Sequence, residues 1–274
     1  MLAATLLALA AAVLHAGWNL LVKQQGDRWL SLWGMFTIAG VLAIPVYLLM
    51  GGMAAIGWPY AIVTGAVHIA YAAGLALAYD RGDFSVSYPV ARGGGALLAA
   101  IGGVALLGDH LSRLSTVGIA VVVAGLVVLA VGQGHVRLLP ALAVAATIAT
   151  YTLIDAEGSR RTDTNAYAMA VYIMVGVALT TYGLALGRGR RMAATIRARG
   201  WTLAAGGVAS ALAYTFVLAA VRLAPVGYVT ALRESSVVLA ALAGWKLLGE
   251  SQAHRRLAAA GIVLLGLVLL VAGG

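Results

Sequence analysis

The sequence predicts an all-α membrane protein of ten transmembrane helices, arranged as two inverted five-helix repeats. Three observations lead to this fold class: the composition, a regular succession of long apolar segments, and an internal repeat. The chain is 62% hydrophobic and only 10% charged, with a mean hydropathy of +0.98. Soluble globular domains average about 45–50% apolar and about 25% charged residues. The composition alone therefore places most of the chain in a lipid bilayer.

Ten apolar segments, separated by short polar breaks, follow one another along the chain. We expect helices at 2–22, 30–50, 57–79, 85–107, 113–133, 136–156, 165–187, 201–221, 226–248 and 256–272. Each is close to the length that a helix needs to cross a hydrocarbon core of about 30 Å. The first segment has no charged residue ahead of it, so we interpret it as a retained helix rather than a signal peptide. The remaining residues are connecting loops, and no soluble domain is expected.

The second half of the chain repeats the first. With LLGD of the fourth segment placed on LLGE of the ninth, at an offset of 141 residues, 16 of the 56 positions in 78–133 are identical without a gap. The matches include Arg92 with Arg233. We therefore divide the chain into an N-terminal repeat, 1–133, and a C-terminal repeat, 134–274. Five helices per repeat is an odd number, so the repeats cross the membrane in opposite orientations, a plan common among transporters.

The net charge of +9 comes largely from Lys and Arg in the loops, which indicates membrane topology rather than nucleic-acid binding. Most of these residues lie in the loops that follow the first, third, fifth, seventh and ninth helices. The other loops hold only Arg113, Arg160, Arg161 and Arg222. By the positive-inside rule, the more basic loops face the cytoplasm and both termini face outward.

Short motifs near the ends of three segments resemble those of one family. The first segment ends HAGWNLLVK, and the fourth and ninth end LLGD and LLGE, each followed by a short polar hinge. With the doubled five-helix plan, the chain resembles the EamA branch of the drug/metabolite transporter superfamily over essentially its whole length. The resemblance implies ten helices around a central cavity and secondary transport, as exporter or exchanger, of a small organic metabolite such as an amino acid or organic acid. We expect a multi-pass protein of the bacterial inner (cytoplasmic) membrane.

Two arginines lie at membrane depth, where a charged side chain costs about 2.5–3.5 kcal/mol and usually faces a cavity or a partner. Arg92 in the fourth helix and Arg233 in the ninth occupy equivalent places. Because a guanidinium fork suits a carboxylate or phosphate, both are candidate substrate-binding residues, together with Tyr88 and Glu234. The alternative is a structural pair between Arg92 and Glu234, or snorkelling to an interface. Helix neighbours point about 100° apart, so Arg233 and Glu234 are not expected to face one spot.

Other polar and aromatic side chains recur inside the apolar segments. The further substrate-binding candidates are Trp18, Asn19, Tyr71, Tyr151 and Tyr214, and the candidates for coupling to protons are His15, His68 and Asp155. An unperturbed histidine titrates near pH 6.5, and ionisable groups inside membranes often form proton relays. The alternatives are a histidine hydrogen-bonded to a backbone carbonyl in the core, an asparagine that caps or bridges helices, and an aspartate that ends its helix at the water interface.

The glycines 93–95 next to Arg92 permit either a local unwinding of the fourth helix or close helix packing. The chain has no cysteine and no motif for a metal or nucleotide, so no cofactor is expected. The expected partners are a small-molecule substrate, the bilayer and protons as a candidate coupling ion, while the oligomeric state stays open. Two other classes also stay open: a non-transporting membrane assembly subunit and a membrane-embedded transferase.

Overall fold

The computed structural model describes residues 2–107, 112–131, 135–221, 223, 229 and 232–273. Within these ranges the regular structure is entirely helical, and nine helices are long and apolar enough to cross a membrane. The all-α membrane class is thereby confirmed. The repeated residues Gly108 and Asp109 of LLGD, and Arg222 of the second repeat, lie outside the described residues.

The first half of the chain forms five long helices and one short 3-10 turn. They are α1 (Leu2–Gln24), α2 (Arg28–Leu49), η1 (Ala55–Gly57), α3 (Trp58–Arg81), α4 (Phe84–Leu107) and α5 (Arg113–Ala130). Polar caps set two of the starts, because the first backbone N–H groups of a helix have no partner within it. Asp27 accepts a hydrogen bond from Leu30 N–H at 3.0 Å, and the Ser112 hydroxyl accepts one from Ser115 N–H at 3.1 Å.

The second half forms α6 (His135–Arg160), α7 (Thr164–Ala185), α8 (Gly189–Val221), α10 (Ser236–Leu248) and α11 (Ala253–Ala272). Two predictions differ from this. The basic loop before the predicted helix 201–221 is itself helical, since its Arg, Ala and Met residues favour helix, and α8 bends only at Arg199. The predicted helix 226–248 is helical without interruption only from Ser236, because Glu234 and Ser235 form a turn; 224–228, 230 and 231 lie outside the described residues. The thirteen residues of α10 are too few to span a bilayer.

The fourth helix is continuous, so the unwinding considered at its glycines does not occur. α4 runs through Pro89, Arg92 and all three glycines. The glycines allow close packing instead. A Cβ atom on Gly93 would lie 2.8 Å from a methyl carbon of Val263, and one on Gly95 would lie 2.6 Å from a methyl carbon of Ile148.

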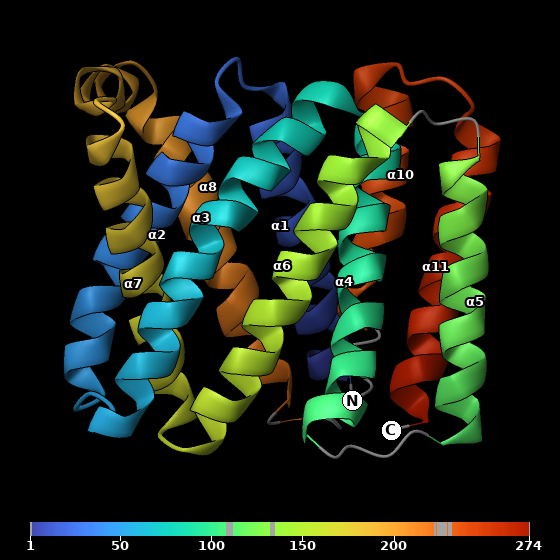
Figure 1. Cartoon of the computed structure of the whole chain (residues 1–274), viewed down its shortest axis with the longest axis horizontal. Coiled ribbons are helices and arrows are strands. Elements are labelled where there is room, and N and C mark those ends of the chain that lie inside the picture. The colour runs from blue at the N-terminus through green and yellow to red at the C-terminus, as the bar shows by residue number, and fades with distance from the viewer. Residues whose placement is uncertain are drawn as a thin grey trace.

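The helices run between two opposite faces of the molecule (Figure 1). One face, at the top of Figure 1, carries the α1–α2, α3–α4, α7–α8 and α10–α11 connections, and we call it the basic face. The other face carries the α2–α3 and α6–α7 connections and both ends of the chain, and we call it the terminal face. The termini therefore lie on the face opposite the more basic loops.

The two halves share one core rather than forming separate domains. The largest cluster of buried apolar residues takes members from α1 to α5 and from α6 to α11. α5 and α11 pack backbone to backbone at one end of the molecule, because Gly118 and Gly266 face each other. A Cβ atom on Gly266 would lie 2.5 Å from the backbone nitrogen of Val122. Small residues of this kind allow close approach of helices in membranes.

Candidate functional site

A cavity of about 470 Å³ lies among α1, α2, α3, α4, α6, α7 and α8. Its polar and aromatic lining comes from both halves of the chain. This lining consists of His15, Trp18, Phe36, His68, Tyr71, Arg92, Tyr151, Thr152, Asp155, Ser159, Thr164, Tyr167, Tyr172, Ser210, Tyr214 and Arg233. Small-molecule sites typically measure about 300–1,000 Å³ and combine apolar walls with a few polar groups. The size and lining fit such a site.

The structure brings nine of the twelve predicted site residues to this one cavity. They are Trp18, Tyr71, Tyr151, Tyr214, Arg92, Arg233, His15, His68 and Asp155. The other three, Asn19, Tyr88 and Glu234, do not line the cavity and are buried behind its wall.

One carboxylate holds both arginines at the inner end of the cavity. Arg92 Nη2 donates to Glu234 Oε1 at 2.5 Å, and Arg233 Nη2 donates to the same oxygen at 3.1 Å. The Glu234 side chain is 4% exposed, that of Arg92 14% and that of Arg233 34%. The second carboxylate oxygen, Oε2, is buried without a hydrogen-bond partner among the described atoms. Two cations share one anion, so the cluster carries one net positive charge beside the cavity.

The turn at Glu234 corrects the expectation that Arg233 and Glu234 point to different places. That expectation assumed a helix through both residues. The chain turns instead at Glu234 and Ser235, where Ser235 N–H donates to Leu232 O at 3.1 Å. The turn lets neighbouring side chains meet at one oxygen. The ion pair between Arg92 and Glu234, one of the alternatives from sequence, is present and joins the two halves of the chain.

Aromatic rings cover the middle of the cavity. His68 lies against Tyr151 with ring centroids 4.6 Å apart, and it also contacts Phe36 and Tyr71. Trp18 packs edge-on against Phe36. Rings offer flat apolar surfaces and polar edges. The cavity therefore combines a cationic inner end with an aromatic middle section.

Asp155 holds a second polar cluster, nearer the terminal face. Its Oδ1 accepts hydrogen bonds from the Thr64 hydroxyl at 2.6 Å and from the Tyr167 hydroxyl at 2.7 Å. His68 Nδ1 donates to the backbone oxygen of Thr64 at 2.8 Å, so His68 and Asp155 are joined through one residue. Asp155 is not at the helix end, because α6 continues to Arg160.

Sequence reasoning missed several members of this site. Thr64 and Tyr167 bind Asp155, and Tyr172, Ser210 and Phe36 line the cavity. Thr64 lies one turn before His68 on the same helix face, and this spacing was a signal that could have found it. The others carry no comparable signal, because an isolated aromatic or serine in an apolar helix is usually a core residue.

Asn19 and Tyr88 support the cavity from behind. Asn19 Oδ1 accepts from the Tyr79 hydroxyl at 2.7 Å, and its Nδ2 donates to the backbone oxygen of His15 at 2.9 Å. Tyr88 is 1% exposed, and its ring packs against those of His15 and Phe84. Asn19 thus bridges α1 and α3, as one of the alternatives from sequence has it.

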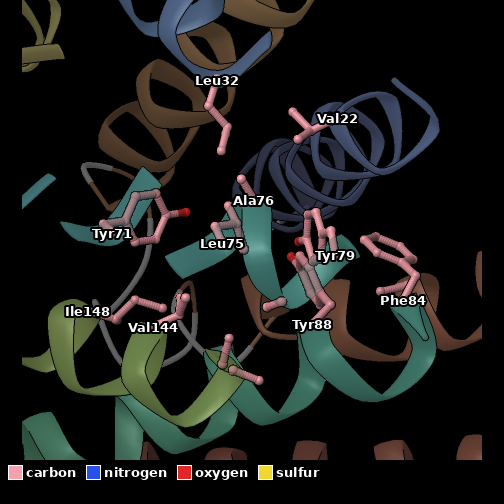
Figure 2. Packing of buried hydrophobic residues seen from close by; sticks show 14 of the residues in the cluster. Val22, Leu32, Tyr71, Leu75, Ala76, Tyr79, Phe84, Tyr88, Val144 and Ile148 are labelled. Carbon is pink, nitrogen blue, oxygen red and sulfur yellow. The ribbon is translucent and has the colours of Figure 1, made fainter. Parts of the chain in front are cut away.

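The cavity is closed toward the basic face by a layer that we call the plug. Its members are at most 2% exposed: Val22, Leu32, Leu75, Tyr79, Phe84 and Tyr88. Figure 2 shows Tyr79, Tyr88 and Phe84 next to one another, with Leu75 to their left and Val22 and Leu32 above them. On α6 and α7 the cavity lining reaches Ser159 and Thr164, at the connection on the terminal face. The cavity therefore extends to the terminal face and stops at the plug.

Comparisons with known proteins agree with this architecture. The profile of the EamA-like transporter family matches residues 137–272, the C-terminal half of the chain. Ten solved protein chains are similar in fold. One crystal structure superimposes with a TM-score of 0.60 over 98% of this chain and 96% of its own, at 19% identity, which establishes the fold alone. No curated protein matches the chain.

Proposed function

The chain belongs to the EamA-like transporter family and is a membrane transporter of the drug/metabolite type, and we propose that its substrate is a small organic metabolite bearing a carboxylate or phosphate. The observation that carries this proposal is the net positive charge of Arg92, Arg233 and Glu234 at the inner end of the cavity. A guanidinium presents donors in a fork that matches these anions. Amino acids and organic acids both carry the required group.

We further propose that transport proceeds by alternating access between two inverted repeats, divided near residue 134. The helix contacts occur in matched sets that support this. α3 packs on α6 and α7, while α8, its counterpart, packs on α1 and α2. α4 packs on α6 as α10 packs on α1, and α4–α10 and α5–α11 pair with each other. A cavity that reaches only one face is the arrangement that one half of such a cycle requires.

The more basic loops support a cytoplasmic location of the basic face in a bacterial inner membrane. In that orientation the cavity opens outward in this structure, and the plug separates the site from the cytoplasm. Export or exchange then requires a second state in which the plug opens. His15, His68 and Asp155 are the proposed groups for coupling to protons, because each lines the cavity and can exchange a proton with water there.

Uptake and efflux in proteoliposomes test the proposal. We expect movement of at least one amino acid, organic acid or phosphorylated metabolite, with an organic cation as the negative comparison. Arg92→Gln and Arg233→Gln should abolish it, whereas Arg161→Gln, which changes an exposed arginine on the terminal face, should not. The proposal is wrong if only cations move. It is also wrong if both cavity variants fold and transport at the rate of the parent.

A further inference from the structure

The tip of the α3–α4 hairpin is held on the basic face by charged side chains from three other helices. Lys23 of α1 donates to the backbone oxygens of Tyr79 and Gly82, each at 2.7 Å. Arg28 of α2 pairs with Asp80. The start of α4 is bound by residues of the α10–α11 hairpin, which belongs to the other half of the chain.

Glu250 caps α4 from a distance of 166 residues along the sequence. Its Oε1 accepts from Phe84 N–H at 2.5 Å, and its Oε2 accepts from Ser85 N–H at 2.9 Å and from the Ser85 hydroxyl. The N–H groups that open a helix are usually capped by the residue just before it, and a carboxylate there is also favoured by the helix dipole. Here this local function is performed by the opposite repeat, so it joins the two halves.

Two glycines of the LLGE region allow this contact. Gly249 ends α10 in the left-handed conformation, with φ of 65°, and turns the chain so that Glu250 faces back across the helix end. Gly244 lies where Ser85 and the carboxylate of Glu250 meet α10. A Cβ atom on Gly244 would lie 2.8 Å from Ser85 Cβ and would collide with Glu250 Oε2.

Arg256 of α11 completes the contact. Its Nη2 donates to Asp83 Oδ2 at 2.6 Å, and its Nη1 donates to the Ser85 hydroxyl oxygen at 2.9 Å and lies 3.4 Å from Glu250 Oε2. The side chains of Arg256 and Glu250 are 6% and 7% exposed. The nearly buried side chains of Arg256 and Glu250 thus bind the residues at the start of α4. These residues are Asp83, Phe84 and Ser85.

Phe84, whose backbone N–H donates to Glu250, also belongs to the plug. The Phe84 ring packs against Tyr79 and Tyr88, each with ring centroids 5.4 Å away. Holding the backbone at Phe84 therefore holds its ring over the inner end of the cavity. Movement of the start of α4 away from α10 would displace this ring.

We propose that Glu250 and Arg256 form a latch that keeps the cavity closed toward the basic face and that opens once in each transport cycle. The inference rests on the proposed alternating access. Polar groups suit a contact that must break repeatedly, because water replaces their hydrogen bonds when the helices part. Water cannot replace the close glycine contacts between α5 and α11 in the same way. We therefore expect these two helices to stay together throughout the cycle.

Accessibility of an introduced cysteine tests the latch. The chain contains no cysteine, so a single replacement gives one reactive site. Ala76→Cys places a thiol next to the plug, on the basic-face side of the cavity residues of α3. Ala168→Cys places one in the cavity wall. A membrane-impermeant thiol reagent is applied separately to each face of proteoliposomes, and the labelling rates are compared.

Glu250→Gln and Arg256→Gln should each raise the labelling rate at the Ala76→Cys site from the basic face by about tenfold or more, the effect of losing at least one charge-assisted hydrogen bond. Gly244→Ala should act in the same direction without changing a charge. The matched controls are Arg255→Gln, which removes an arginine bound to Val128 O, and Gly261→Ala, where an added Cβ atom meets nothing within 4 Å.

The latch is refuted if Glu250→Gln and Gly244→Ala leave the rate unchanged, or if the controls raise it equally. Gly244→Ala keeps the test decisive if Glu250→Gln does not fold. Transport is measured on the same preparations. A parent that moves no compound would refute the proposed function, while the labelling rates would still decide whether these residues close the cavity.

Discussion

Replacing Glu234 by glutamine should destabilise the protein more than replacing Arg233 by glutamine, because the Glu234 carboxylate is the one anion shared by the Arg92 and Arg233 guanidinium groups. Removing one partner of a buried ion pair typically costs about 3–5 kcal/mol. We expect about 3 kcal/mol for Glu234→Gln, since the amide oxygen still accepts one hydrogen bond. Arg233→Gln leaves the pair of Arg92 and Glu234 intact and removes a side chain that is 34% exposed, so about 1 kcal/mol is expected.

Thermal unfolding in detergent, followed by the fluorescence of the six tryptophans, measures this difference. On the scale of soluble domains, where about 1 kcal/mol shifts Tm by about 2–4 °C, the losses are about 6–12 °C for Glu234→Gln and about 2–4 °C for Arg233→Gln. Glu157→Gln, which changes an exposed pair with Arg161, is the control and should leave Tm nearly unchanged. Equal shifts for Glu234→Gln and Arg233→Gln, or a shift below about 3 °C for Glu234→Gln, would refute the shared-carboxylate geometry.

Three further substitutions test other parts of the structure. Asn19→Ala leaves the buried hydroxyl of Tyr79 without its acceptor and should lower stability by about 2 kcal/mol in the same assay; an unchanged Tm would contradict the bridge between α1 and α3. Gly266→Ala should cost about 1–3 kcal/mol by forcing α11 from α5, whereas Gly17→Ala, with nothing within 4 Å, should be neutral or slightly stabilising. Asp155→Asn should make transport independent of an imposed pH gradient, with Tyr167→Phe weaker in the same direction, and a retained gradient dependence in Asp155→Asn would exclude Asp155 as the coupling group.

Nine of the ten expected spans, within the part of the chain that the structure describes, and most of the cavity could be predicted from the sequence because the bilayer imposes strict conditions. A helix must be long and apolar to cross it, and a polar side chain at depth must find a cavity or a partner. Arg92, Asp155 and His68 stand out for this reason, and all three line the cavity. The same reasoning cannot separate a lining residue from a supporting one. Asn19 satisfies its polar atoms inside the wall, where the acceptor and the donor come from different helices.

The rest could not be predicted because it depends on contacts between residues far apart in the chain. LLGE is visible as a motif, but nothing local indicates that its carboxylate caps α4. Thr64 bonds to Asp155 across 91 residues, and no period along either helix connects them. The helical conformation of the basic loop was missed for a different reason. The charge of this segment indicates a loop, but its arginines and alanines are also good helix formers, and the helix forms.

The residues that follow the paired arginines differ between the two repeats, and this difference affects the charge of the site. In the first half, α4 continues through Gly93 and Gly94, which allow neighbouring helices to pack closely, so Arg92 projects from a regular helix. The aligned residues of the second half are Glu234 and Ser235, where the chain turns and supplies the carboxylate that holds both arginines. A symmetric pair of arginines alone would place two unneutralised charges at membrane depth. With Glu234 one charge remains, enough to attract a single anionic group while keeping both guanidinium groups oriented.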